Sequence, residues 1–265
     1  MQKLKGKIRK WFEDYTGNYT KGEDQENIIL KIEHSKRVAK DIGLICVGLE
    51  LNEYDRDLAE ICGILHDVGR FEQYKRYKTF NDAHSVNHAE LGVQVIIEQR
   101  ILKELPEIEQ NLILKAISYH NRLDLPVDED ESILYFSKIL RDGDKLDIFK
   151  VVTDYYAVRS KKRNETLELE LPDEGDITDI VYDAVLQGRI VDYRKIKNLN
   201  DFKLLQVGWV YGLNFLPSIK LFDEREYLGK LQAALPDNEK CRAIFNQVRN
   251  YIVRRLQDEE TRLTG

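Results

Sequence analysis

The residues of this chain best able to do chemistry are its histidines, all of which lie between His34 and His120. Four of the five are predicted to lie on separate helices or at helix ends. Imidazole nitrogens and carboxylate oxygens together suit Fe, Mn, Co, Ni or Zn. One such histidine alone would more often be a hydrogen-bonded residue at the edge of the core, so the hypothesis of a metal site rests on the set. Its members are His34, His66, Asp67, His88 and His120.

A further acidic ligand is expected from Arg141–Asp147, which reads RDGDKLD. On a helix, Asp144 falls within about 20° of the apolar face marked by Ile133, whereas Asp142 falls on the opposite side. A charge on a packed face is costly unless it is paired or bound to a metal. We therefore predict Asp144 as the ligand and Asp142 as a solvated charge or an acceptor behind the ligands. Asp147 could orient a histidine.

His84 needs separate treatment, because its spacing of four residues from His88 would pair the two on one helix. Asn87 lies between them and is a predicted N-cap, with Glu90 three residues later completing a capping box. The stretch Arg70–Val86 before this cap is polar and aromatic and is predicted to be a loop. We therefore expect His84 at the rim of the site rather than among the ligands.

Helical periodicity and a low content of glycine and proline predict an all-α fold. Gly69 is predicted to stop the second helix. We expect a catalytic core over residues 1–160 and a helical extension over 161–265, which either closes over the site as a lid or only completes the core. The helices are expected at about 23–51, 52–66, 88–104, 106–120, 132–160, 200–213, 216–234 and 238–260.

The composition favours a cytoplasmic protein that binds neither nucleic acid nor membrane. The net charge is −6, and no basic footprint is evident beyond short runs such as Lys161–Arg163. The most apolar run, Ile42–Leu49, is far shorter than the roughly 20 residues that span a bilayer. Cys46, Cys62 and Cys241 form no spaced pair, and they are expected to be reduced.

The motifs around these residues resemble the HD superfamily of metal-dependent phosphohydrolases. The order of the motifs and the lengths between them fit the family over about residues 26–150. The matching elements are His34 in HSKRVA, His66 and Asp67 in ILHDVGRF, His88 in HAELG, His120 in YHNR, and Asp144 in DGDKLD.

This resemblance implies a helical bundle around two divalent transition-metal ions, with Mg²⁺ also compatible. The chain has Gly143 before Asp144, where Ala is usual in the family, and both residues are small. The first ion would be held by His34, His66, Asp67 and Asp144, and the second by His88 and His120, with Asp67 bridging the two.

The activity implied is hydrolysis of a phosphoester by a metal-activated hydroxide, with Asp67 as the catalytic carboxylate. A nucleotide or a small phosphorylated metabolite is the expected substrate. Arg70, Arg122 and Lys145 are candidates to hold its phosphates, because each lies one to four residues from a proposed ligand. Otherwise they are surface or capping cations.

Two other functions remain open at this point, a dinuclear-iron oxygenase of the same fold and a non-catalytic nucleotide-binding sensor. Completeness of the ligand set argues against the sensor. No GYP element follows the doublet, so a role with cyclic-di-GMP is not indicated. Four aromatic residues of the predicted loop could stack on a base or pack beneath the loop, namely Phe71, Tyr74, Tyr77 and Phe80.

Overall fold

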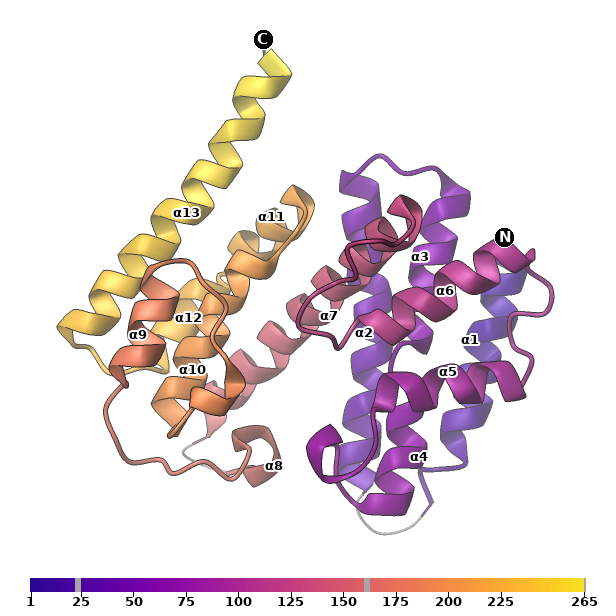
Figure 1. Ribbon diagram of the computed structural model, residues 1–265, viewed down its shortest axis with the longest axis horizontal. Coiled ribbons are helices and arrows are strands. Elements are labelled where there is room, and N and C mark those ends of the chain that lie inside the picture. Colours follow the sequence, from indigo (N-terminus) through magenta and orange to yellow (C-terminus); the bar gives the residue numbers. More distant parts are fainter. Residues whose placement is uncertain (22–24, 160–162, 265) are drawn as a thin grey trace. The chain divides into compact units, whose positions relative to one another are not determined.

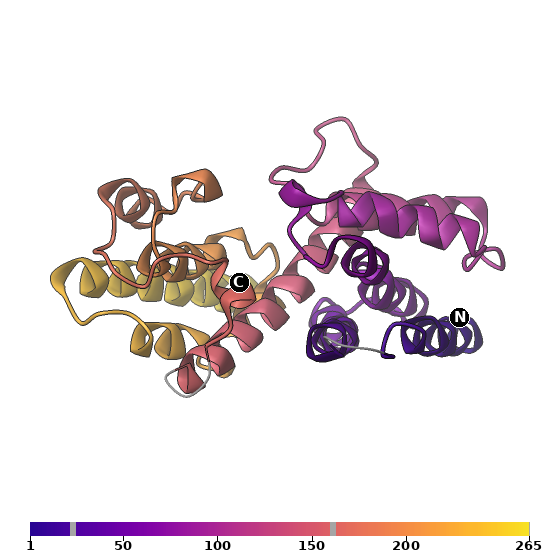
Figure 2. The same ribbon diagram turned by 90° about the horizontal axis from the view of Figure 1, so that it is seen from below.

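The computed structural model describes residues 1–21, 25–159 and 163–264, and within these ranges the regular structure is entirely helical (Figures 1 and 2). The predicted all-α class is therefore confirmed. The chain divides into two compact units, Met1–Asp147 and Ile148–Gly265. The sequence predicted a division at residue 160. That residues 1–160 form a catalytic core and 161–265 an extension of it stays a prediction. No helix in the described ranges is long and apolar enough to cross a membrane.

The first unit contains every predicted ligand. Its central pair is α2 and α3, which pack along each other, and α1 lies against α3. The sequence had predicted no helix for the segment of α1. The elements are α1 (Gln2–Gly17), α2 (Gln25–Gly48), α3 (Glu53–Leu65), α4 (Val68–Tyr77), the 3₁₀ turn η1 (Asp82–His84), α5 (His88–Glu98), α6 (Glu107–Tyr119) and α7 (Glu131–Val158), which continues into the second unit.

Helix α4 corrects two expectations, because the chain after Arg70 is helical and Gly69 does not stop a helix. Val68, Phe71 and Tyr74 form a buried face at helical spacing, so this polar stretch has an apolar side after all. The helix ends at Lys78, which has a left-handed backbone with φ of 55°. Gly69 instead lets α4 approach α5, since a Cβ there would lie 2.2 Å from the carbonyl oxygen of His88.

The start of α5 follows the prediction. The side chain of Asn87 caps the helix by accepting hydrogen bonds from the backbone N–H groups of Ala89 and Glu90. The helix ends earlier than expected, at Glu98, and Arg100 then adopts a positive φ of 51°. At the other end, the cap at Asn87 makes His88 the first residue of α5, and the His88 side chain is buried.

The second unit packs further helices around an aromatic centre, in which the rings of Phe149 and Phe222 lie 4.7 Å apart. The single helix expected at 216–234 is two helices, separated at Glu226, which has φ of 56°. The expected connection 161–176 begins outside the described residues and includes a short helix with a buried Glu168. The elements are α8 (Glu165–Glu168), α9 (Asp179–Leu186), η2 (Tyr193–Lys195), α10 (Leu199–Gly208), η3 (Trp209–Gly212), α11 (Leu216–Glu224), α12 (Tyr227–Ala233) and α13 (Glu239–Thr264).

Candidate metal centre

The fold brings the six predicted ligands into one cluster inside the first unit. The Nε2 atoms of His34 and His66 lie 3.3 Å apart, and those of His88 and His120 lie 3.0 Å apart. Asp67 lies between the two pairs. Two triads within the described residues have ligand atoms all within 4.8 Å of one another: His34, His66 and Asp144, and His66, Asp67 and His120. That these residues bind metal stays a prediction.

Each of the four imidazoles is held by a hydrogen bond at Nδ1. His66 and His120 cap the C-terminal ends of α3 and α6, and each bonds a carbonyl three residues back, Gly63 at 2.7 Å and Ile117 at 2.6 Å. A carbonyl can only accept, so Nδ1 carries the proton in both rings. The Nε2 lone pairs are then left facing the cluster.

The other two imidazoles bond carboxylates instead. Nδ1 of His34 lies 2.6 Å from Oδ2 of Asp147, as the sequence suggested, and Nδ1 of His88 lies 2.7 Å from Oδ2 of Asp82. A carboxylate at Nδ1 fixes the tautomer and raises the basicity of the Nε2 atom. All four rings therefore have the orientation of metal ligands.

These donors fit divalent cations. With each Nδ1 protonated, the Nε2 lone pairs of His88 and His120 face each other at 3.0 Å, a repulsive arrangement unless a cation or proton is shared between them. The His34 and His66 pair is similar, and Oδ1 of Asp144 approaches its Nε2 atoms to 3.2 Å and 3.8 Å. Neutral imidazoles with carboxylates form the donor set expected for Fe, Mn, Co, Ni or Zn.

Asp67 divides its two oxygens between the histidine pairs. Oδ2 lies 3.5 Å from the Nε2 atoms of both His34 and His66, whereas Oδ1 lies 3.3 Å from Nε2 of His88. One carboxylate can therefore reach two ions, each through its own oxygen. Asp67 is almost fully buried, and it ends the short turn that joins α3 to α4.

A lysine that sequence reasoning missed is in direct contact with this carboxylate. Nζ of Lys31 lies 2.7 Å from Oδ2 of Asp67. Burial would raise the pKa of Asp67, but the Lys31 ammonium, with smaller effects of neighbouring charges, holds it well below its usual range. The only sequence signal was position, since Lys31 precedes His34 by about one helical turn.

The histidine pairs differ in their protonation behaviour. Burial and the charge of Lys31 lower the pKa of His34, but hydrogen bonds to its two carboxylate partners outweigh them and leave it raised. Burial lowers the pKa of His88, and the charge of Arg70 adds to this effect. Burial lowers the pKa of His120 to about 3, with contributions from the other histidines. His88 and His120 are therefore neutral near pH 7, as metal ligation requires.

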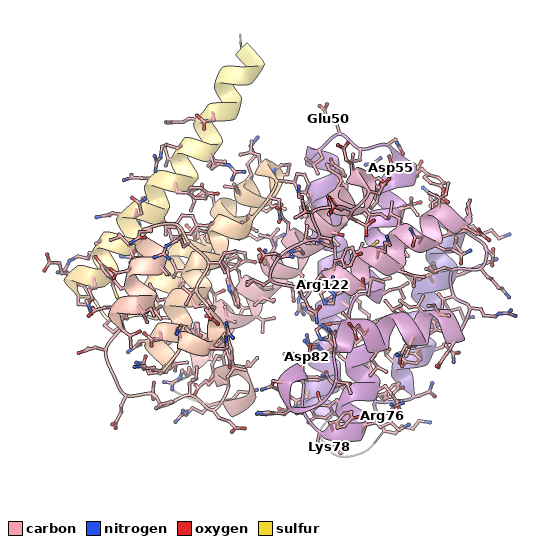
Figure 3. The ribbon with its side chains drawn as sticks, viewed as in Figure 1. Glu50, Asp55, Arg76, Lys78, Asp82 and Arg122 are labelled. Carbon is pink, nitrogen blue, oxygen red and sulfur yellow. The ribbon has the colours of Figure 1, made fainter. Side chains whose placement is uncertain are left out.

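Asp82 is the second residue that sequence reasoning missed. It lies in η1, in the turn between α4 and α5 (Figure 3), and its carboxylate accepts from Arg70 and Gln73 as well as contacting His88. No periodic signal marks an aspartate in such a turn. Its position depends on contacts made by α4, which the sequence had predicted to be a loop.

Asp142 is completely buried, so the prediction of a solvated charge is wrong. Leu140, which lies on the opposite side of α7 from Asp142, is buried as well, and so is Gly143. A Cβ on Gly143 would lie 2.5 Å from Cγ1 of Ile42, so here even alanine would require Ile42 to move. A helical wheel of α7 alone could not reveal that α7 is packed on more than one side.

The three predicted phosphate contacts differ in their surroundings. Arg70 Nη1 donates to the side chain of Asp82 at 2.9 Å, while its Nε lies 3.5 Å from Asp67 and forms no hydrogen bond. Arg122 is exposed and lies 4.6 Å from the centre of the Tyr119 ring. Lys145 is half-buried, and burial lowers its pKa. Contact with a phosphate stays a prediction for all three.

Of the aromatic residues proposed for base stacking, two are packing residues. Phe71 is fully buried against Phe12 and Tyr19, and Tyr74 is buried as well. Tyr77 is exposed, and Phe80 is half-buried. His84 is exposed in η1 and belongs to neither triad, in keeping with a rim position.

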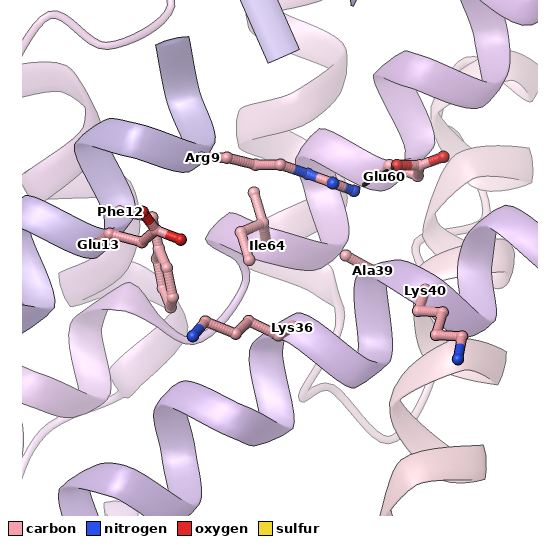
Figure 4. Close-up of a pocket in the computed structure, with 8 residues that line it drawn as sticks. All are labelled: Arg9, Phe12, Glu13, Lys36, Ala39, Lys40, Glu60 and Ile64. Atoms are coloured by element: carbon pink, nitrogen blue, oxygen red, sulfur yellow. Dashed lines mark hydrogen bonds and ion pairs between the residues drawn. The ribbon is translucent and has the colours of Figure 1, made fainter. Parts of the chain in front are cut away.

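A cavity of about 480 Å³ lies elsewhere in the first unit, between α1, α2 and α3 (Figure 4). Arg9 and Glu60 form an ion pair of 2.7 Å along it, and Lys36 and Lys40 line it from α2. None of the predicted ligands lines this cavity, and its floor residue Phe12 is fully buried. The convergent lone pairs of the histidine cluster therefore identify the better candidate site.

Residues 32–149 match the family model described as HD domain, a range that begins within α2, ends within α7 and includes all six clustered residues. No curated protein and no solved structure matches the chain.

Proposed function

We propose that the chain, whose residues 32–149 match the HD domain, works as a metal-dependent phosphohydrolase of the HD superfamily and hydrolyses a phosphoester with bound divalent cations. The observation that carries this proposal is the convergence of four imidazole Nε2 atoms on Asp67, each ring held at Nδ1 by an acceptor. Such a set has no evident structural use, since facing lone pairs in a buried site are unfavourable without a cation.

We further propose that the cluster holds two ions. His34, His66 and Asp144 would hold the first ion, and His88 and His120 the second. Asp67 would bridge the two positions, because Oδ2 faces the first pair and Oδ1 approaches His88 to 3.3 Å. The second position has fewer protein ligands, which leaves more room there for water and substrate.

Bound divalent cations would supply a water of lowered pKa and a positive charge for the phosphoryl oxygens. The protein's own part would be to hold the cations and to neutralise charge on the phosphate. Asp67 stays ionised at neutral pH because its pKa is held well below the usual range. Lys31 lies 2.7 Å from that carboxylate, so an ammonium group is present beside the reaction centre and could donate to a phosphate oxygen.

The proposed substrate is a nucleotide or another small phosphorylated metabolite. Arg70, Arg122 and Lys145 are the proposed contacts for its phosphates, and Tyr77 or Phe80 could lie against a base. An acidic chain with net charge −6 favours a small substrate over a nucleic acid polymer.

The test combines metal analysis with phosphate release. Wild-type protein, His88→Ala, His120→Ala and the control His84→Ala would be loaded with Mn²⁺, Co²⁺ or Fe²⁺. Bound metal would then be counted, and phosphate release would be assayed with a panel of nucleotides and sugar phosphates. We expect about two ions in the wild type and in the control, fewer in the two test variants, and metal-dependent release only where both ions remain.

Two results would contradict the proposal. One is metal binding without phosphate release from any substrate in the panel, whichever ion is loaded. The other is iron-dependent oxygen consumption with no phosphate release, which would indicate oxidation rather than hydrolysis.

A further inference from the structure

The two histidine pairs are supported by separate parts of the first unit. In the first pair, His34 bonds Asp147 on α7, and the same carboxylate accepts from Nη2 of Arg37 at 2.9 Å. In the second pair, His88 bonds Asp82 in η1. Within the described part of the chain these two supporting carboxylates bond different residues, so each could be altered without touching the other.

Asp82 is the centre of a network that joins four segments around the second pair. Its Oδ1 accepts from Nη1 of Arg70 at 2.9 Å and from Nε2 of Gln73 at 2.8 Å, both on α4. Its Oδ2 contacts Nδ1 of His88 at the start of α5 and accepts from Nδ2 of Asn121 at 3.2 Å. Asn121 directly follows His120, so the segment that carries His120 also bonds this carboxylate.

Helix α4 holds the turn that carries this carboxylate. Gln73 is fully buried, and besides Asp82 its amide donates to Oγ of Ser85 and to the carbonyl of Val86, each at 2.9 Å. Arg70 also donates to the carbonyl of Phe80. Both ends of the turn are thereby fixed to α4, which places Asp82 opposite His88.

We infer that Asp82 is a positioning residue for the second metal position and sets the occupancy of that position independently of the first. This inference rests on the proposed function, in its dinuclear form. A carboxylate at Nδ1 of His88 keeps the proton there and directs the Nε2 lone pair to the ion. The first position keeps its own support, Asp147, and is unaffected by Asp82.

Asp82→Asn is a precise perturbation of this arrangement. Whichever way the new amide is oriented, its NH₂ group meets a donor, either Nδ1–H of His88 or the Arg70 and Gln73 groups. Because Arg70 is a cationic donor, the amide oxygen should stay on the side of Arg70 and Gln73. The NH₂ group then meets His88 and drives the ring to the tautomer whose Nε2 carries the proton and cannot bind a metal. Loss of such a partner typically weakens metal affinity by about 10- to 100-fold.

The experiment is a calorimetric titration with Mn²⁺ of the wild type, Asp82→Asn and the matched control Asp147→Asn. We expect Asp82→Asn to keep one ion at wild-type affinity and to bind the other about 10- to 100-fold more weakly. Asp147→Asn should weaken the ion that Asp82→Asn leaves intact. In a His120→Ala background, Asp82→Asn should cause little further loss, because the same position is already impaired.

A second measurement separates a positioning role for Asp82 from a purely structural one. If Asp82 positions His88, nitrogen NMR of metal-free protein with labelled histidines should show His88 protonated at Nδ1 in the wild type and at Nε2 in Asp82→Asn, with the other rings unchanged. Equal weakening of both ions, an unchanged titration or a single ion in the wild type would overturn the inference. Since no substrate is used, failure of the phosphate-release assay would sink the proposed activity and leave this result standing.

Discussion

Gly69→Ala tests whether the close approach of α4 and α5 is what brings His88 to Asp67. A Cβ at position 69 would lie 2.2 Å from the carbonyl oxygen of His88 and 2.5 Å from the backbone nitrogen of Gly92. Ordinary contact begins at 3.4 Å, so the two helices must separate by about 1.2 Å at this point. Both atoms that would be struck are backbone, so no side-chain rotation can relieve the clash.

The expected cost follows from this geometry. Overpacking typically costs about 1–3 kcal/mol, and the better helix propensity of alanine returns up to about 1 kcal/mol. Since both struck atoms are backbone, we take the upper end of that range, about 3 kcal/mol, and expect Gly69→Ala to lower the free energy of unfolding by about 2 kcal/mol. The His88 ring should also move away from Asp67, from which Nε2 is now 3.3 Å distant, and the second ion should bind more weakly.

Urea unfolding of the metal-free protein and a Mn²⁺ titration would measure the two effects. The matched control is Gly6→Ala in α1, where a Cβ would meet nothing within 4 Å. That control should gain up to about 1 kcal/mol from helix propensity and leave metal binding unchanged. If Gly69→Ala were as stable as Gly6→Ala and bound both ions normally, the helix contact would not be what positions His88.

Three further predictions concern charge and metal. Lys31→Met removes the ammonium that competes with a cation for Asp67, so we expect about tenfold tighter metal binding by titration but slower turnover; weaker binding would contradict this. The pKa of His120 is lowered to about 3, so the unfolded chain takes up its proton first, and stability is lost as pH falls from about 6.5 toward 3. In thermal melts of the metal-free protein, the melting temperature should therefore fall more steeply with pH below 6.5 in the wild type than in His120→Gln. Equal slopes of melting temperature against pH would refute the assignment. Removing metal with a chelator should lower stability, by about 2.7 kcal/mol relative to metal at 100 times its dissociation constant, and an unchanged melting temperature would argue against a metal site.

Much of the site could be predicted from the sequence because its ligands belong to short motifs on strongly periodic helices. The cap at Asn87 placed His88 at a helix start, and the face of α7 pointed to Asp144, whose Oδ1 lies 3.2 Å from Nε2 of His34. These inferences need only one helix at a time. They succeed because local periodicity determines where each side chain points.

The rest depends on contacts between helices, which a single sequence does not display. Helix α4 has the sequence pattern of a loop because its apolar face consists of a few residues spaced among charges. Asp82 was missed for the same reason, since its place is set by Arg70 and Gln73 on that helix. The burial of Asp142 likewise reflects packing on both sides of α7. Tertiary contact, rather than propensity, decides all of these features.

The positions of His66 and His120 at the C-terminal ends of α3 and α6 have an electrostatic consequence. The aligned peptide dipoles of a helix amount to roughly half a negative charge at its C-terminal end. Two such ends lie at the cluster, each favouring a nearby cation by about 0.3–1 kcal/mol. The N-terminal ends of α4 and α5, which begin at Val68 and His88 beside the same cluster, carry roughly half a positive charge each. These four helix ends largely offset one another, so the attraction for metal resides in the carboxylates and imidazoles rather than in the backbone.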